Sequence, residues 1–209
     1  MGRPKQPKAT RNLLLDAAFE QLYLHGFHGT SIQAILQQSG LTKGALFHHY
    51  ASKKALALAT LEQIITPLIY ERWLEPLEQP GNPVDILQEL FRNTEQRMML
   101  GNLGERALLL GCPLGQLAQE MSPLDSDFRQ GCEQVFTMWR EGLSGVLEMG
   151  QQQRQVRTDI DSGAVARFLI AALEGSISMA RQSATIDSAR RTIRECSEHL
   201  VQHLEWLRY

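Results

Sequence analysis

The residues best suited to chemistry lie together in one short segment, Thr42-Lys43-Gly44-Ala45, which offers a helix-capping hydroxyl, a cation and two small side chains. A cation in the first turn of a helix can bind phosphate or guanine, and small residues let a backbone approach base edges closely. The N-terminus of a helix also favours an anion. The side chains that follow can hydrogen-bond phosphate oxygens; they are His48, His49, Tyr50 and Lys53. The segment therefore predicts a nucleic-acid-binding surface.

Two short helices are expected to position these residues, at about 31–38 and 42–49, with Ser39-Gly40-Leu41 between them. Two helices joined by a tight turn that contains glycine are typical of a helix-turn-helix. Apolar residues at helical spacing on both helices can form a small shared core; they are Ile32, Ile35, Leu36, Leu41, Leu46 and Tyr50. A preceding helix is predicted from the periodicity, with Thr10 as its cap and Gly26 as its stop.

The distribution of charge supports the same interpretation. The chain has 209 residues and a formal net charge of −2, which by itself argues against a nucleic-acid partner. Residues 1–60 carry a net charge of +5 and residues 61–209 a net charge of −7, and every lysine lies at or before position 54. Such asymmetry is typical of a nucleic-acid-binding end joined to a different domain.

On these residues the chain resembles the TetR family of bacterial transcriptional regulators. The likeness lies in Gly26-Phe27 with Thr30, in the run from Thr42 to Tyr50, and in Ser52-Lys53-Lys54-Ala55-Leu56. The chain departs from the family pattern at Phe47, where a tyrosine is usual, and at His49 and Tyr50. The resemblance implies an all-α protein with an N-terminal three-helix DNA-binding domain and a helical C-terminal domain for ligand binding and dimerisation.

The resemblance also implies roles for individual residues. Thr30 and Ser31 are expected to contact phosphate from the first motif helix, and Lys53 from the start of the next helix. The expected recognition surface consists of Thr42, Lys43, Gly44, Ala45, Phe47, His48 and His49, with Tyr50 at its end. From the residues alone, the alternative is that Phe47 and Tyr50 are purely core residues.

The rest of the chain is predicted to be helical, with about nine helices in all. The expected division is a flexible basic arm at 1–8, a helix-turn-helix domain at 9–54 and a ligand-binding and dimerisation domain at 55–209. Pro67 is expected to kink a helix that starts near Ser52. Asn82-Pro83 and Ser122-Pro123 are expected to start two further helices, as a cap followed by proline. The last two helices are predicted at about 162–182 and 188–207, capped by Asp161 and Asp187.

These last two helices are the predicted dimer interface. Homodimers are a family property, and two-fold symmetry suits a palindromic operator. The residues expected in a four-helix bundle across the dyad are Phe168, Ala172, Gly175, Met179, Ile193, Leu200 and Leu204. The alternative is that both stripes serve only the core of one chain.

An inducer pocket is implied by the resemblance between residues 60 and 180. The candidates for its lining are Trp73, Phe91, Met98, Phe128, Phe136, Trp139 and Phe168. Aromatic residues and methionines can line an adaptable apolar cavity, although the same residues at helical spacing are ordinary core. The expected inducer is an unidentified small molecule, apolar or electrophilic.

Cys112 is a candidate sensor of oxidants or electrophiles. Pro113 would be the first residue of a helix and would place Cys112 at its N-cap, where the helix end could lower the pKa of the thiol. The Gly-Cys sequence also resembles a cysteine-bearing, electrophile-responsive subgroup of the family. The alternative is a small buried hydrophobic residue.

Other classes of function find little support. Cys196, His199 and His203 share one helix face, but no fourth metal ligand is evident, so no metal site or cofactor is expected. The chain has no Walker loop, dinucleotide glycine motif, G-x-S-x-G elbow or HExxH, so an enzyme is not expected. The sequence has neither a signal-peptide pattern nor a membrane-length apolar run, which favours the cytoplasm. The rival function is a helical ligand-binding or interaction protein without operator binding.

Overall fold

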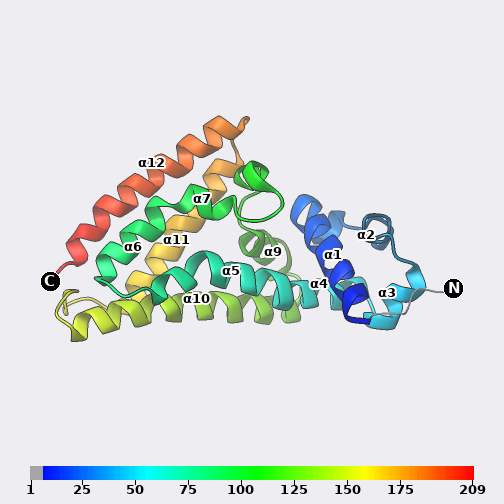
Figure 1. Cartoon of the computed structure of the whole chain (residues 1–209), viewed down its shortest axis with the longest axis horizontal. Coiled ribbons are helices and arrows are strands. Elements are labelled where there is room, and N and C mark those ends of the chain that lie inside the picture. Colours follow the sequence, from blue (N-terminus) through cyan, green and yellow to red (C-terminus); the bar gives the residue numbers. More distant parts are fainter. Residues whose placement is uncertain (1–6) are drawn as a thin grey trace. The chain divides into compact units, whose positions relative to one another are not determined.

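The computed structural model describes residues 7–209, and within them the all-α prediction is confirmed (Figure 1). Apart from an isolated bridge between Val156 and Arg208, the described residues contain no β-structure. Helix α1 spans Pro7–Gly29, so the predicted flexible arm is wrong at Pro7 and Lys8, and residues 1–6 lie outside the described part. Thr10 lies inside α1 and does not cap it.

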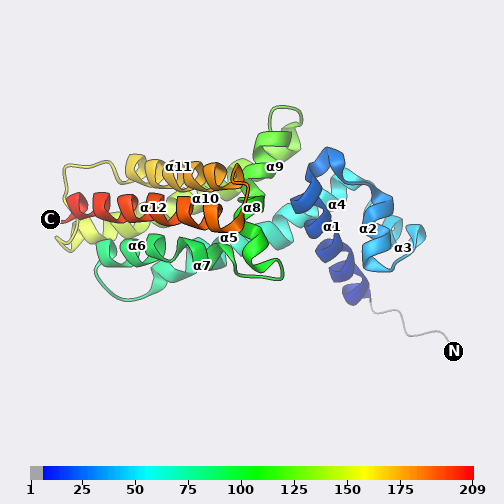
Figure 2. The ribbon, with the colours of Figure 1, turned by 90° about the horizontal axis from the view of Figure 1, so that it is seen from above.

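The predicted helix-turn-helix is present as α2 (Ile32–Ser39) and α3 (Lys43–His49), and both helices pack against α1 (Figure 2). Gly40 ends α2 with φ 66°, in the left-handed region that glycine enters without strain. The small shared core predicted from the sequence is confirmed. Ile35, Leu46 and Tyr50 are buried with Leu14 and Ala18 of α1, and three more apolar residues pack partly buried against them, namely Ile32, Leu36 and Leu41.

The helix that follows contains the irregularity expected near Pro67. It runs as α4 (Lys53–Thr60), a π-helical turn at Leu61–Ile65 and α5 (Thr66–Trp73). Pro67 has no backbone N–H to donate, and its ring would clash with the carbonyl four residues earlier. The wider π turn is one way to relieve such a clash, and here both the amide and the hydroxyl of Thr66 donate to the carbonyl of Leu61.

The middle of the chain forms shorter helices and one long one. They are η2 (Glu75–Glu78), α6 (Pro83–Arg92), α7 (Thr94–Met98), η3 (Gly104–Arg106), α8 (Ala107–Leu110), α9 (Pro113–Met121) and α10 (Ser126–Gln152). Asn82 caps α6 as predicted. The predicted start of α10 at Ser122-Pro123 is wrong, because these residues form a turn and the carboxylate of Asp125 accepts hydrogen bonds from the amides of Asp127 and Phe128.

The chain closes with α11 (Ser162–Arg181), α12 (Ile186–Leu204) and the short η4 (Glu205–Leu207). Asp161 caps α11 as predicted, whereas Thr185, not Asp187, caps α12. Among the described residues, α11 alone is long and apolar enough to cross a membrane by length and composition. Its buried face packs against α12 and α8, so it is a core helix of this fold.

Two compact units make up the chain. The first contains residues 1–68 together with 116–133, and the second contains residues 69–115 and 134–209. The first unit therefore holds the helix-turn-helix and also most of α9 and the first turns of α10. The sequence predicted a functional boundary after residue 54, between the DNA-binding domain and the ligand-binding and dimerisation domain. That boundary stays a prediction.

Candidate nucleic-acid interface

The start of α3 is built by a side-chain cap. Thr42 is extended, and its hydroxyl oxygen accepts a hydrogen bond from the amide of Ala45 at 3.2 Å, as the sequence predicted. Ser31 caps α2 in the same way by accepting from the amide of Ala34 at 3.1 Å. Because each hydroxyl uses only its oxygen for the cap, its proton remains available to a phosphate oxygen. Ser31 and Thr42 are both exposed.

The outward face of α3 brings together most of the predicted recognition residues. Lys43, Gly44, Phe47 and His48 are exposed, and Ala45 and His49 are half-buried. Phe47 is 43% exposed, and the ammonium of Lys43 lies 5.9 Å from the centroid of its ring. A Cβ added at Gly44 would meet only the hydroxyl oxygen of Thr42, at 4.0 Å, so this turn is open to the outside.

Three of the predicted contact residues point inward. Thr30 is buried, and its hydroxyl donates to the carbonyl of Gly26 at 2.6 Å. Tyr50 is buried, and its hydroxyl accepts from the Nε of Arg11 at 3.3 Å. The ammonium of Lys53 donates to the carbonyls of Phe27 and Thr30, both at 2.8 Å. The hydrogen bonds of these three side chains stay within the protein, beneath the exposed recognition surface. The structure therefore does not favour their predicted contacts with phosphate.

Two residues that stabilise this surface were not predicted from the sequence. Arg11 counted only toward the charge total, and its bond to Tyr50 joins α1 to the end of α3. Glu120 of α9 accepts hydrogen bonds from the amides of Phe27 and His28, both at 2.8 Å. Because Glu120 lies more than ninety residues from these amides, no local spacing signals the pairing.

Comparisons with known proteins decide the family. Residues 14–60 match the model described as "Bacterial regulatory proteins, tetR family", and residues 86–196 match the model "Tetracyclin repressor-like, C-terminal domain". The second match alone covers more than half of the chain. The chain belongs to the TetR family. It is thus a DNA-binding transcriptional regulator with an N-terminal helix-turn-helix, and members of this family bind operators as dimers.

Individual relatives agree with this assignment. The chain is 26% identical over 205 residues to the transcriptional regulator AcuR of Cereibacter sphaeroides, covering 96% of this chain and 90% of that one. An uncharacterised HTH-type transcriptional regulator of Lactococcus lactis is 30% identical over 130 residues, and this match spans 61% of this chain and only 63% of that protein. The crystal structure of a TetR transcriptional regulator from Chloroflexus aurantiacus superposes with a TM-score of 0.77 at 25% identity, covering 94% of this chain and 96% of that one.

The residues predicted to line an inducer pocket do not form one set in this TetR-family chain. The ring of Trp139 stacks on that of Trp73, with ring centroids 5.7 Å apart, and on that of Phe136, at 6.3 Å. Phe91 and Met98 are also buried in the second unit. Phe128 belongs instead to the first unit, where its ring packs edge-on against Phe27 at 5.1 Å. Phe168 is 51% exposed, so its assignment to a cavity is wrong.

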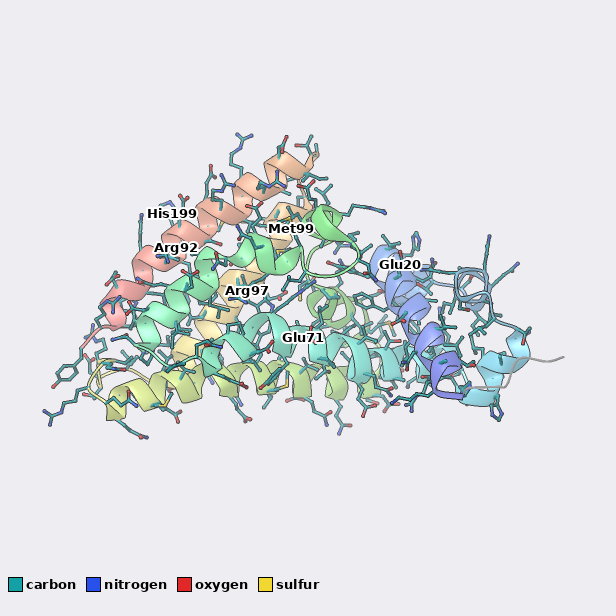
Figure 3. The ribbon with its side chains drawn as sticks, viewed as in Figure 1. Glu20, Glu71, Arg92, Arg97, Met99 and His199 are labelled. Carbon is teal, nitrogen blue, oxygen red and sulfur yellow. The ribbon has the colours of Figure 1, made fainter. Side chains whose placement is uncertain are left out.

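The structure does contain a groove of about 490 Å³ in the second unit, lined by residues of α6, α7 and α12. Its lining is mostly polar and charged and includes Arg92, which Figure 3 marks on α6, with Glu95, Arg194 and Glu198. None of the predicted pocket residues lines it.

Cys112 caps α9 as predicted, but its pKa shifts in the opposite direction. Its sulfur accepts a hydrogen bond from the amide of Gly115 at 3.4 Å. Burial raises the pKa of the Cys112 thiol well above its ordinary value, and the adjoining carboxylate of Glu174 raises it further. The prediction of a pKa lowered by the helix end is therefore wrong.

We expect Cys112 to react slowly with alkylating reagents. Each unit by which a thiol pKa rises removes about nine-tenths of the reactive thiolate at neutral pH. Measured by mass spectrometry on the folded protein, alkylation of Cys112 at pH 7 should be slower than that of half-buried Cys196, and should still accelerate between pH 8 and pH 10. A rate at Cys112 that levels off below pH 8 would contradict the raised pKa.

The predicted dimer stripes divide into two sets. Ile193 and Leu204 are fully buried within the chain, so the structure places them in its own core and not at an interface. Phe168, Gly175 and Met179 are exposed along one side of α11, and Ala172 and Leu200 are half-buried.

Among the described residues no three histidine, cysteine or acidic side chains gather as metal ligands. The ring of His203 instead lies against those of Phe168 and Trp206.

Proposed function

We propose that two copies of this chain bind a palindromic operator in the cytoplasm as a repressor, with one α3 helix in the major groove at each half-site. The observation that carries this proposal is the open first turn of α3, where exposed Lys43 and Gly44 stand beside a capped helix N-terminus. Lys43 supplies a cation for phosphate or guanine, and Gly44 lets the backbone approach the base edges. Two half-sites one helical turn apart suit the two-fold symmetry of a dimer.

The exposed stripe on α11 supports dimerisation through this helix and α12. Met179 is 63% exposed and Phe168 half exposed, and a Cβ added at Gly175, between them, would have no atom within 4 Å. Large apolar side chains spaced along one exposed helix face suit burial against another helix. The open glycine permits a close approach of the two backbones.

We also propose a small apolar molecule as the inducer. Because the groove on α6, α7 and α12 is lined by none of the buried aromatic residues, the inducer would have to enter among these residues of the second unit. Trp73, Phe136 and Trp139 form a stacked aromatic series there, and Phe91 and Met98 add further apolar surface to the same unit. A ligand that binds the non-operator conformation more tightly would shift the dimer away from DNA. A coupling of about 1–3 kcal/mol would change operator affinity about 5- to 150-fold.

A salt titration tests the operator-binding proposal. Affinity for duplex DNA should fall steeply with salt, and Lys43→Ala should make the slope of log K against log [salt] shallower by about 0.9 if Lys43 contacts one phosphate. Arg92→Ala is the matched control, because it removes one exposed cation from the second unit and should leave the slope unchanged. Absence of DNA binding at low salt would contradict the proposal and would favour a ligand-binding or interaction protein.

A further inference from the structure

Helix α1 is interrupted near its end by Gly26. This residue has φ 72° and ψ 177°, which lie outside the helical region. The amides of Phe27 and His28 therefore begin a new turn, and amides in a first turn have no acceptor within their own helix. Glycine suits the position twice, because the positive φ strains other residues and an added Cβ would lie 2.6 Å from the Oε2 of Glu120.

Glu120 supplies the missing acceptors with both oxygens of one carboxylate. The amide of Phe27 donates to its Oε2 and the amide of His28 to its Oε1, each at 2.8 Å. Hydrogen bonds from backbone amides to an ionised carboxylate are shorter and stronger than neutral ones, and a negative charge at the start of a helical turn is favourable. The ring of Phe27 also packs against Phe128 of α10, close in sequence to Glu120.

Three carbonyls of the same segment also accept hydrogen bonds from side chains. The ammonium of Lys53 donates hydrogen bonds to the carbonyl oxygens of Phe27 and Thr30, and the hydroxyl of Thr30 donates to the carbonyl oxygen of Gly26. We call residues 26–30, held between Glu120 and Lys53, the clamped segment. It ends directly before Ser31, the N-cap of α2, so its conformation sets where the helix-turn-helix begins.

We propose that Glu120 is a positioning residue for operator binding: its carboxylate fixes the clamped segment and thereby the orientation of α2 and α3. The inference rests on the proposed function.

The decisive variant is Glu120→Gln in the full-length chain. Glutamine offers one acceptor oxygen, and its amide group would face the second backbone N–H, so one of the two bonds is lost. Two probes are needed: a duplex that the wild-type protein selects from a random pool, and a random duplex. Affinity for the selected duplex should fall about ten-fold, within the range of site-to-site couplings, while affinity for random DNA stays level or rises because a negative charge is removed. A merely destabilised protein would lose both affinities together.

The control is Glu133→Gln, which removes the same charge from an exposed position on α10 in the same unit. Removing a negative charge favours DNA binding in general, so this variant should bind both duplexes at least as tightly as the wild type. Glu120→Asp keeps the charge but is one methylene shorter, so it should lose affinity for the selected duplex as Glu120→Gln does. Glu120→Asp also serves as the test variant if Glu120→Gln is unfolded at the assay temperature.

Amide hydrogen exchange tests the clamp without DNA. Exchange at Phe27 and His28 should accelerate in Glu120→Gln and stay unchanged in Glu133→Gln. Unchanged exchange, or unchanged affinity for the selected duplex in a folded Glu120 variant, would overturn the inference. If the wild-type protein selects no duplex, the proposed function fails, and unchanged exchange at these two amides would then reject the clamp separately.

Discussion

Replacement of Gly44 by glutamine is expected to abolish operator recognition without harming the fold. The position lies in the first turn of α3, where an added Cβ would meet no atom closer than 4.0 Å. Glutamine is the better helix former by up to about 1 kcal/mol, so the stability of the first unit should hold or rise. On DNA, the same side chain would fill the space that the backbone needs to approach the bases.

The expected loss is large because specific contacts depend on this approach. Affinity for a selected duplex should drop at least about 1,000-fold, to the level of non-specific binding. Fluorescence anisotropy measures this loss, and urea denaturation measures the stability. Gly145→Gln is the matched control, since Gly145 is also an exposed helical glycine with no atom within 4 Å of an added Cβ. Equal effects of the two substitutions on DNA binding would show that α3 does not read the operator through this turn.

Local signals are what made the helix-turn-helix predictable. Thr42 caps α3, Gly40 takes a left-handed conformation between the two helices, and Leu46 lies at the centre of the small core. The cap and the turn depend on residues within a few positions of one another, so spacing in the sequence identifies them. The helical spacing of the apolar residues indicates which face of α3 is buried, although the core also includes residues of α1. Lys53 looked like a phosphate contact by the same reasoning, but its partners are two carbonyls more than twenty residues away.

Distant contacts account for most of what the sequence left unpredicted. Glu120 caps amides in α1, a pairing that only the folded first unit creates. The start of α10 was misplaced because Ser122-Pro123 has the composition of a helix start, whereas Asp125 forms the actual cap. Several caps compete in such a stretch, and packing decides among them.

Cys112 illustrates two opposing effects whose magnitudes differ. Its position at the cap of α9 was predicted correctly, and a helix end stabilises a charge by about 0.3–1 kcal/mol, less than one pKa unit. Complete burial can shift a pKa by up to about 3–5 units. Burial is the larger effect here and raises the pKa of the thiol. Burial of one residue depends on the whole fold, so the sequence did not indicate which effect would dominate.

Periodicity identified the apolar stripes on the last two helices but not their partners. A residue that repeats every three or four positions faces something apolar, and that can be its own chain or a second copy. The structure separates the two cases, because Ile193 and Leu204 are buried within the chain while Phe168 and Met179 are exposed. The exposed set is the part for which a partner helix is still required.

Gly175→Glu is therefore expected to convert the dimer into folded monomers. Gly175 lies on the exposed stripe of α11, and nothing within 4 Å hinders an added Cβ in the single chain. In a two-fold interface each substitution occurs twice and brings like charges together on a buried surface, which costs several kcal/mol. Sedimentation velocity should report the monomer, and circular dichroism should report an unchanged helix content.

Loss of the dimer should carry over to the operator. A monomer engages one half-site and forfeits the gain from linking two, so affinity should fall about 100- to 10,000-fold. Gly145→Glu adds the same charge to an equally open helical glycine on α10 and should leave both the dimer and most of the operator affinity intact. If Gly175→Glu still forms a dimer, the interface does not lie on this face of α11, because burying two carboxylates without a neutralising partner would cost too much free energy.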